Sequence, residues 1–380
     1  MIVSSYSRPL DEIKFDVNND NSNVGDSRKR IDDIDAQLIE LLNERASVAL
    51  EIGRKKREAG IGILSTERES QIMKRIFQAP EGNMPKKALG HIFSEIISAC
   101  RDLQKPISVA FLGPRTTFSH QVTLRRFGHS TELVAASSIL DVFSEVENDR
   151  VSFGVVPVEN SIEGGVSATM DSFVTSDLKI SGEIFASIRH FLMSRENSMT
   201  DIKNVYSHPQ ALNQCRKWLN GNMRGVNVQD CSSTAEAARK ASVERGVAAI
   251  ASSLAASEFN LNILAENIQD RSDNTTRFLI IGKAECKPTG EDKTSLYFTA
   301  KHKSGSLCQA LNHFSKRGIN LGRIESRPLK ERPWEYSFFV DCEGHVQDQN
   351  LSDCLAALKN DVEQIKILGS YPRMDPTQGV

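Results

Sequence analysis

The sequence predicts a multidomain chain with a helical module at its N-terminal end, a two-lobed α/β unit in the middle and a ferredoxin-like α+β module at its C-terminal end. Apolar residues recur at helical spacing as far as about residue 105. Short apolar strands then alternate with helices to about residue 285, and a strand, helix, strand, strand, helix, strand pattern fills the remainder. The length of 380 residues agrees with several domains, since a typical domain has about 150 residues.

Composition and charge exclude several classes of protein. Lys and Arg number 47 and Asp and Glu 49, which leaves a net charge of −2, so no global basic field attracts nucleic acid or an anionic membrane. No apolar run approaches the ~18 residues of a membrane helix, and the polar N-terminal segment lacks the core of a signal peptide. We therefore expect a soluble, cytoplasmic protein that is not secreted and binds neither nucleic acid nor a membrane.

The seven cysteines are an odd number, and each stands alone in the sequence. They form neither a CxxC pair nor a His/Cys spacing of the kind that holds a structural metal. We expect seven reduced thiols and no metal site.

The helical module begins after a polar segment, residues 1–27, which we expect to be flexible because it cannot bury enough apolar surface to offset ordering. From Arg28 to Lys56 the apolar residues keep a helical period for about eight turns, too long for a compact monomer. STERE at 65–69 starts a second helix, and Pro85 stands in the first turn of a third. Narrow apolar seams on three helices predict a bundle that a second chain completes.

Cations stand on the apolar stripe of the first of these helices. At about 100° per residue, Arg45 and Lys56 fall within the stripe and Arg28 lies on its edge. A cation on a core-facing stripe is unfavourable unless it is paired. An internal salt bridge or a stem that reaches water explains one such residue, but three on one helix favour an anionic ligand inside the bundle. Glu69 has an alternative explanation, since Thr66 and Glu69 satisfy a helix capping box.

The α/β unit covers about residues 107–285. We expect it to divide into two lobes near 190–203, with SRENSMT (194–200) as the crossover, and two lobes form a cleft. Polar residues gather at strand ends in GPRTTFS (113–119), VPVENSIEGGV (156–166), YSHPQAL (206–212) and NTTRFLIIG (274–282). Each segment taken singly is as well explained by a turn, a helix cap or an ordinary strand.

The last part of the chain begins with a linker expected at 286–292. Strands are expected at 294–300, 319–328, 336–341 and 364–372, with helices from Ser306 and Leu351. This order is the split βαβ pattern of a ferredoxin-like module.

Residues 28–104 resemble the all-helical chorismate mutase family in RKRIDDIDAQLIELLNERASVALEIGRKK, TERE and IFSEIISACRDLQ. The resemblance implies a cofactor-free rearrangement of chorismate to prephenate in a dimer, with Arg28 supplied by one chain and the other site residues by its partner. The implied chorismate-binding residues are Arg28, Arg45, Lys56, Ser65, Arg68, Glu69, Cys100 and Gln104.

Within that implied site, the two carboxylates of chorismate would meet Arg28, Arg45 and Arg68. Lys56 and Gln104 would lie by the ether oxygen, where negative charge grows as the bond breaks. The implied catalytic residues are Arg28, Arg45, Lys56, Glu69 and Gln104. Ser65 and Cys100 depart from the family pattern, which often has Asp and Ser there.

Residues 107–285 resemble the prephenate dehydratase family through GPxxTFS, PVENSIEG, GEIFASIRHFL, YSHPQALNQCRKWL and ENIQDRSDNTTRF. The resemblance implies conversion of prephenate to phenylpyruvate and makes Thr276 the essential catalytic group, which assists loss of the ring hydroxyl. The implied prephenate-binding residues are Glu159, Asn160, Ser161, Ser207, His208, Gln210, Thr276, Arg277 and Phe278, with Arg277 as the carboxylate anchor. Thr116 stands where the family usually has Gly. If the turn requires φ > 0 at this position, a threonine there would distort it.

GSLCQAL (305–311) and ESRP (325–328) resemble the ACT regulatory domain attached to prephenate dehydratases. The resemblance implies a site through which L-phenylalanine inhibits the dehydratase. Its implied residues are Gly305, Ser306, Leu307, Glu325, Ser326, Arg327 and Pro328. Without the resemblance, GSL is only a helix start and ESRP only a strand end.

The resemblances together imply a flexible segment at 1–27, a chorismate mutase domain at 28–105, a prephenate dehydratase domain at 106–285 and an ACT domain at 293–374. We expect a cofactor-free, metal-free bifunctional enzyme of phenylalanine biosynthesis that forms a homodimer or a larger homo-oligomer. Its ligands would be chorismate, prephenate and L-phenylalanine. Two alternatives remain: a monofunctional dehydratase whose helical segment only dimerises, and a two-lobed sensor without catalysis.

Overall fold

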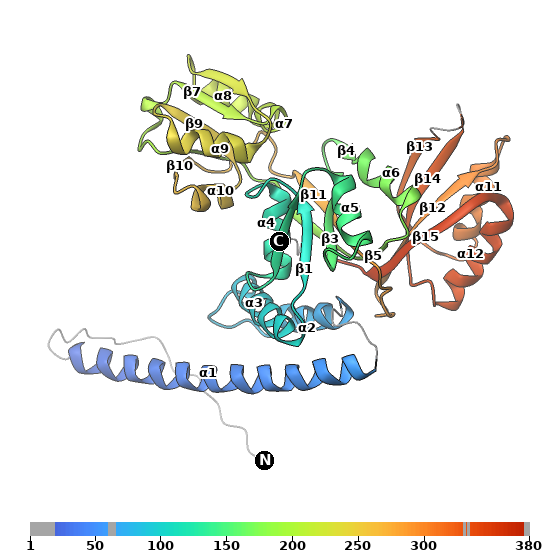
Figure 1. Ribbon diagram of the computed structural model, residues 1–380, viewed down its shortest axis with the longest axis horizontal. Coiled ribbons are helices and arrows are strands. Elements are labelled where there is room, and N and C mark those ends of the chain that lie inside the picture. Colours follow the sequence, from blue (N-terminus) through green and yellow to red (C-terminus); the bar gives the residue numbers. More distant parts are fainter. Residues whose placement is uncertain (1–19, 60–65, 330–331, 333–334, 376–380) are drawn as a thin grey trace, which may run out of the picture.

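The computed structural model describes residues 20–59, 66–329, 332 and 335–375 (Figure 1). Its N-terminal region has three helices, α1 (Asp20–Glu58), α2 (Thr66–Gln78) and α3 (Lys86–Gln104). The predicted helices are thus confirmed, but α1 starts earlier than expected. Residues 20–27 are helical rather than a flexible segment, and residues 1–19 lie outside the described residues.

The long helix α1 is covered only in part. Its C-terminal half approaches α3, where Ala49 and Gly53 are buried, and Figure 1 shows the rest of the helix extending past α2 and α3. On its predicted stripe seven large apolar side chains are exposed by between 42% and 59%: Ile31, Ile34, Leu38, Leu41, Leu42, Val48 and Ile52. Such a continuous apolar stripe is typical of a helix that packs against another chain.

The first lobe of the α/β unit is built on one mixed sheet. Its strands are β1 (Ser108–Leu112), β2 (Glu132–Ala136), β3 (Phe153–Asn160), β4 (Gly164–Gly165), β5 (Lys179–Ser187) and β11 (Thr275–Gly282). Its helices are α4 (Phe118–Phe127), α5 (Ile139–Glu147) and α6 (Ser167–Thr175). The strand order is β2-β1-β3-β11-β5, with β4 paired to β3, and β11 runs antiparallel to both of its neighbours.

The two faces of this sheet have different coverings. On one face α4 packs over a core that includes Phe111, Phe127 and Phe278. On the other face α5 and α6 share a core with the C-terminal module, since Tyr297 and Tyr371 belong to the same buried cluster. Consecutive residues of β11 point to opposite faces, so each strand residue faces either α4 or the C-terminal module.

The second lobe has a five-stranded sheet of its own, in the order β10-β6-β9-β7-β8. Its strands are β6 (Phe191–Ser194), β7 (Asn204–Ser207), β8 (Asn227–Asp230), β9 (Val247–Ala251) and β10 (Asn262–Ala265). Its helices are η1 (Met199–Asp201), α7 (Pro209–Gln214), α8 (Arg216–Asn222), α9 (Thr234–Val243) and α10 (Ser253–Glu258).

The boundary between the lobes differs from the expected one. The chain crosses between β5 and β6, at residues 188–190, and returns between β10 and β11, at 266–274. The two crossing segments are hydrogen-bonded to each other, Ile188 N to Asn274 O at 2.8 Å and Ile268 N to His190 O at 3.0 Å. SRENSMT (194–200) therefore lies inside the second lobe, and the prediction that it is the crossover was wrong. A polar segment between two strands looks the same in the sequence whichever sheet the next strand joins.

The C-terminal module has the predicted ferredoxin-like order. Its elements are β12 (Asp292–Ala300), α11 (Ser306–Ser315), β13 (Leu321–Pro328), β14 (Tyr336–Glu343), α12 (Gln349–Asp361) and β15 (Val362–Pro372). The sheet order is β13-β14-β12-β15. Both helices pack on one face with Phe298 and Phe338, whereas Tyr297 and Phe339 of the other face join the core of the first lobe. The module is therefore packed onto the first lobe and is not connected to it by a linker alone.

Three further features follow from the described residues. No helix among them is both long enough and apolar enough to span a bilayer, and no group of their His, Cys, Asp and Glu side chains is arranged to hold a metal ion. All seven cysteines are free thiols. Burial raises the pKa of Cys215 and of Cys342 to about 12, so neither thiol is ionised near neutral pH.

Candidate active sites

Two of the three cations predicted on the stripe of α1, Arg45 and Lys56, lie on the half of the helix that approaches α3. Arg45 is half-buried, and its Nη1 lies 3.5 Å from the carbonyl oxygen of Ile96 on α3. Lys56 is also half-buried. Gly53 permits this approach, because a Cβ at that position would lie 2.8 Å from the side chain of Gln104. The structure therefore brings Arg45, Lys56 and Gln104 to one contact between two helices.

Gln104 is the member of this group with an unused polar atom. Its Nε2 donates to the carbonyl oxygen of Cys100 at 3.3 Å, but its Oε1 is buried and has no hydrogen-bond partner in the described part of the chain. Cys100 is itself buried at 7% exposure. A buried amide without a full set of partners is unfavourable, so a polar ligand at this position would be stabilising.

Arg28 lies far from that group within one chain. It is 17 residues from Arg45 on the same helix, which places it about 25 Å away at 1.5 Å per residue. Arg28 and Arg68 are exposed, and Ser65 lies outside the described residues. One chain thus holds only part of the predicted set in one place.

Glu69 occupies a different environment from the one predicted. Its carboxylate is buried and accepts from Arg101 of α3 at 2.7 Å and from Arg126 of α4 at 2.6 Å. Burial raises the pKa of the Glu69 carboxyl, but attraction to Arg126 and Arg101 outweighs that effect and holds the pKa below its ordinary value. Both oxygens are engaged at the contact with the α/β unit, so within one chain Glu69 links the helical module to that unit.

A polar network lies where the two lobes meet, and it centres on Thr276. Asn160 Nδ2 donates to Thr276 Oγ1 at 2.9 Å and to Asn274 Oδ1 at 2.8 Å. Asn274 Nδ2 donates to Gln214 Oε1 at 3.0 Å, and His190 Nε2 lies 2.8 Å from the same oxygen. These residues come from β3, β11, α7 and both crossing segments, so the network joins the two lobes.

The hydrogen bonds of this network determine which ring nitrogen of His190 carries the proton. Gln214 Oε1 only accepts, so both Asn274 and His190 donate to it, which places the imidazole proton on Nε2. Burial lowers the pKa of His190, although its bond to Gln214 opposes the shift. His190 therefore stays neutral, and each amide in the network has a single favourable orientation.

Other predicted polar residues, from both lobes, surround this junction. Ser161 Oγ accepts from Thr275 N at 3.0 Å and donates to Asp273 O at 3.1 Å, and Ser207 Oγ is buried and donates to Ile250 O. His208 caps the N-terminus of α7. Gln210 donates to Glu163 of the first lobe, so α7 is fastened across the junction.

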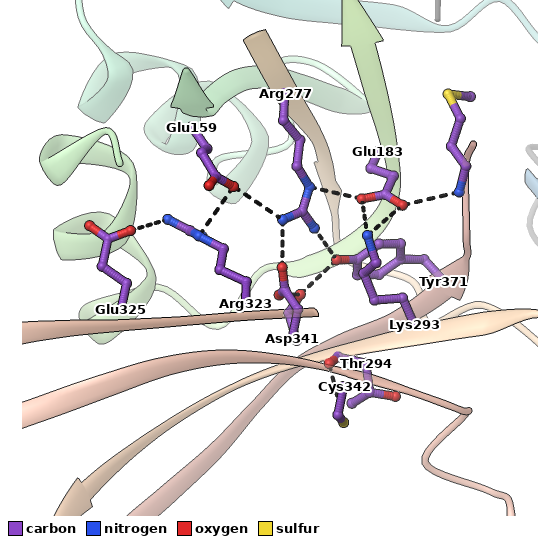
Figure 2. A network of polar contacts seen from close by, with 12 residues as sticks. Glu159, Glu183, Arg277, Lys293, Thr294, Arg323, Glu325, Asp341, Cys342 and Tyr371 are labelled. Carbon is purple, nitrogen blue, oxygen red and sulfur yellow. Dashed lines mark hydrogen bonds and ion pairs between the residues drawn. The ribbon is translucent and has the colours of Figure 1, made fainter. Parts of the chain in front are cut away.

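Three predicted prephenate contacts lie elsewhere. Phe278 is 2% exposed in the core under α4. Arg277 and Glu159 face the C-terminal module, where Arg277 pairs with Asp341 and Glu183 (Figure 2). The alternation of side chains along a strand is the reason, since neighbours of Thr276 and Asn160 must point to the opposite face. The expectation that Arg277 anchors a substrate carboxylate at the junction does not fit this placement.

The turn before α4 has the strained conformation that its sequence suggested. Thr116 has φ of 71°, a value rare for a β-branched residue. Its backbone N–H donates to His120 Nδ1 at 3.0 Å, and its carbonyl accepts from Ser252 of the second lobe at 2.9 Å. Thr116 Oγ1 is buried and has no hydrogen-bond partner in the described residues. The turn thus contributes to the junction of the lobes.

The predicted effector residues divide between two faces of the C-terminal sheet. Ser306 is buried and Leu307 half-buried at the start of α11, after Gly305 with φ of 81°. Along β13 the side chains of Glu325 and Arg327 face the first lobe, where Arg327 bonds Ser167 and lies 3.3 Å from Asp171. Ser326 and Pro328 are exposed. Within one chain these residues do not converge on a common pocket.

The residues that the sequence-based prediction missed stand inside the motifs it used. Gln214 belongs to QALNQCRKWL, His190 to IRHFL and Asn274 to NTTRF. Gln214 lies one helical turn from Gln210 and Asn274 lies two residues from Thr276, so proximity to a predicted residue was an available signal for these two but not for His190. Only the return of β11 to the first sheet shows that they meet at one junction.

Comparison with known proteins matches the two N-terminal regions to two families. Residues 27–105 match the family chorismate mutase type II, and residues 109–286 match the family prephenate dehydratase. A bifunctional chorismate mutase/prephenate dehydratase of Aquifex aeolicus is 49% identical, over 91% of this chain and 97% of the relative. Its counterpart in Stutzerimonas stutzeri is 42% identical, over 91% and 96%.

Among solved structures, a prephenate dehydratase of Arthrobacter aurescens in complex with L-Phe is similar to this chain, with a TM-score of 0.66 and 33% sequence identity. The alignment covers 71% of this chain and 91% of the Arthrobacter protein.

Proposed function

We propose the function of this chain from the premise that it belongs to the family of bifunctional chorismate mutase/prephenate dehydratases, whose members it matches over nearly their whole length. The helical module rearranges chorismate to prephenate, the α/β unit converts prephenate to phenylpyruvate, and L-phenylalanine inhibits the second reaction. The observation that carries this function is the Thr276 hydroxyl, held by Asn160 where the two lobes meet.

In the dehydratase reaction, the carbon–carboxylate bond of prephenate breaks and releases CO2, and its electron pair enters the ring as the ring hydroxyl departs. The departing hydroxide takes a proton from the solvent and leaves as water. Because Asn160 donates to Thr276 Oγ1, the Thr276 oxygen acts as an acceptor there, and its own hydrogen is free to bond the departing oxygen. Thr276 therefore serves as the hydrogen-bond donor to the leaving group.

The rest of the junction network supports that role. Asn274, Gln214 and His190 fix the Asn160 amide so that its N–H groups point toward Thr276 and Asn274. A donor whose orientation is already set loses little freedom when the transition state forms. We propose Ser161, Ser207, His208 and Gln210 as residues that shape the surroundings of prephenate and not as reacting groups.

In the mutase reaction no nucleophile is required, because the rearrangement is pericyclic and responds to conformation and charge. Arg45 and Arg68 would bind the carboxylates, and Lys56 and Gln104 would donate to the ether oxygen. Since Arg28 lies about 25 Å from Arg45 in one chain, the Arg28 of a second chain would complete the site. The exposed stripe of α1 is the surface on which that homodimer would form.

For the C-terminal module we propose an ACT domain at residues 293–374 that binds L-phenylalanine. Its ferredoxin-like order supports this assignment, as does its similarity to the Arthrobacter protein in complex with L-Phe. Because Gly305–Leu307 and Glu325–Pro328 lie apart in one chain, the site would combine them across two chains. We further propose mutase and dehydratase domains at 28–105 and 106–285, and a cytoplasmic location.

Formation of phenylpyruvate from chorismate and from prephenate, in separate assays with and without L-phenylalanine, tests this function. We expect product from both substrates and inhibition by phenylalanine with either. Product from prephenate alone would favour the monofunctional alternative, in which the helical module only dimerises. Binding of prephenate without release of CO2 would favour the sensor alternative.

A further inference from the structure

A buried charge network lies beneath the strand that carries Thr276 (Figure 2). Arg277 Nε donates to Glu183 at 2.8 Å, its Nη1 to Asp341 at 2.5 Å and its Nη2 to Tyr371 Oη at 2.9 Å. Glu183 belongs to β5 of the first lobe, whereas Asp341 and Tyr371 belong to the C-terminal module. The guanidinium is thus held from both domains at once.

This network is rigid for electrostatic reasons. The side chains of Arg277 and Asp341 are only 6% and 8% exposed. Burial lowers the pKa of Arg277, but attraction to Tyr371, Asp341 and Glu183 raises it well above its ordinary value, so the guanidinium stays charged. Separating a buried charge from its partners is strongly unfavourable. A displacement of the C-terminal module relative to the first lobe would therefore displace the Arg277 side chain with it.

Thr276 follows Arg277 because the two residues are consecutive in β11. Their side chains point to opposite faces of the sheet, one toward the lobe junction and one toward the C-terminal module. The peptide between them is planar and stiff. Since catalytic geometry tolerates errors of only about 0.5 Å, a displacement of this size at Arg277 would matter at the Thr276 hydroxyl.

We propose that Arg277 is a positioning residue of the dehydratase site and that the C-terminal module, by holding Arg277 through Asp341 and Tyr371, sets the position of Thr276. The module is in this sense a structural part of the dehydratase site. Arg277 contacts neither substrate nor the reacting atoms and acts through Thr276.

A second connection reaches the neighbouring strand. Arg323 of β13 lies with its Nε 3.3 Å from Glu159 Oε2 and also pairs with Glu325. Glu159 directly precedes Asn160, which bonds Thr276. A cavity of about 20 Å³, lined in part by Arg277, Arg323 and Asp341, lies beside this network. The connection through Arg323 rests on the proposed function, because β13 carries the proposed effector residues.

The first test compares Tyr371→Phe with Tyr336→Phe. The former removes only the hydroxyl that accepts from Arg277, and the latter removes a hydroxyl from an exposed tyrosine of the same module. For Tyr371→Phe we expect the dehydratase kcat to fall about tenfold, the KM for prephenate to stay within about twofold and the mutase rate to stay unchanged. For Tyr336→Phe we expect wild-type values.

The split between kcat and KM separates positioning from a general loss of structure, provided each variant is assayed well below its unfolding temperature. An unchanged kcat for Tyr371→Phe would overturn the proposal. A fall in kcat that Tyr336→Phe reproduces would also overturn it. A fall in kcat that disappears when rates are expressed per folded molecule would overturn it as well.

The second test compares Arg323→Gln with Arg373→Gln, which removes an exposed ion pair to Glu343 in the same module. For each protein, calorimetry measures phenylalanine binding, and the dehydratase rate without phenylalanine divided by the rate with phenylalanine measures inhibition. For Arg323→Gln we expect phenylalanine to bind within about threefold of wild type but the inhibition ratio to fall at least tenfold, because coupling is distinct from binding. Normal inhibition in Arg323→Gln would overturn the connection through Arg323. Failure of the wild-type protein to bind phenylalanine would instead overturn the proposed regulation.

Discussion

The helical module and the α/β unit differ in how much of a working site one chain contains. In the α/β unit, strands from two lobes bring Thr276, Asn160 and Gln214 into one hydrogen-bonded network without help from another chain. In the helical module, Arg28 and Arg45 lie about 25 Å apart on one helix, and the apolar stripe of α1 is exposed. The difference shows that two sites in one polypeptide can have different requirements for assembly.

The largest expected effect comes from removing one proposed substrate contact from each site. Thr276→Ala should lower the dehydratase kcat by about 10³-fold, since a positioned hydrogen-bond donor to developing charge contributes about 10²–10³-fold, while the mutase rate stays unchanged. Arg45→Ala should lower mutase kcat/KM about 100-fold, because it removes a charged contact to a carboxylate, and should spare the dehydratase. Separate assays of the two reactions measure both. Loss of both activities in either variant would contradict two independent sites.

The next largest effect concerns the contact where the two regions meet. Glu69→Gln removes the charge shared by Arg101 and Arg126, and we expect the free energy of unfolding to fall by about 3–5 kcal/mol, the usual consequence of breaking a buried pair. The control is Glu291→Gln, whose pair with Lys74 is exposed and should contribute less than about 1 kcal/mol. Equal destabilisation of both variants in denaturant titrations would show that Glu69 is not the main link.

This prediction also has a pH dependence. The pKa of Glu69 is held below its ordinary value, so its stabilising contribution is fully present above the unfolded-state pKa of about 4.3 and is lost as the pH falls through the lower folded-state value. The difference in unfolding free energy between wild type and Glu69→Gln should therefore be constant from neutral pH to about pH 5 and shrink at lower pH. A difference that grows on acidification would contradict the charged pairing.

A smaller effect is expected from the stripe of α1. Leu38→Glu places a charge on that stripe, and Ala36→Glu places the same charge on the opposite, exposed face of the helix. If a second chain covers the stripe, Leu38→Glu should weaken the dimer and lower the mutase rate per chain about tenfold in dilute solution, with recovery at higher concentration. Sedimentation and mutase assays over a concentration series check this. Identical behaviour of the two variants would show that the stripe is not an interface.

The sequence predicted most of the architecture because periodicity is a local property. The three helices, the alternation of strands and helices in the α/β unit and the ferredoxin-like order all follow from residue spacing, and Thr276 and Asn160 were placed at strand ends. The sequence could not show which elements pack against each face of a sheet. Strand alternation separates Arg277 from Thr276, but only the packing of the C-terminal module against the first lobe shows what Arg277 meets. The pairing of Glu69 with Arg126 was missed for the same reason, since Arg126 lies 57 residues away in another domain.

The smallest expected effect tests the turn that joins the lobes, at Thr116. Its left-handed backbone and its buried, unpartnered hydroxyl are both unfavourable. Thr116→Gly relieves both and Thr116→Ala relieves only the second, so we expect Gly to stabilise the fold by about 1 kcal/mol and Ala by less, after the entropic disadvantage of Gly is included. Asn260→Gly is the matched control, because Asn260 has φ of 51° but asparagine visits this conformation readily. Denaturant unfolding measures the three variants. Destabilisation by Thr116→Gly would mean that packing of the Thr116 side chain outweighs the strain, and that the junction of the lobes depends on this side chain.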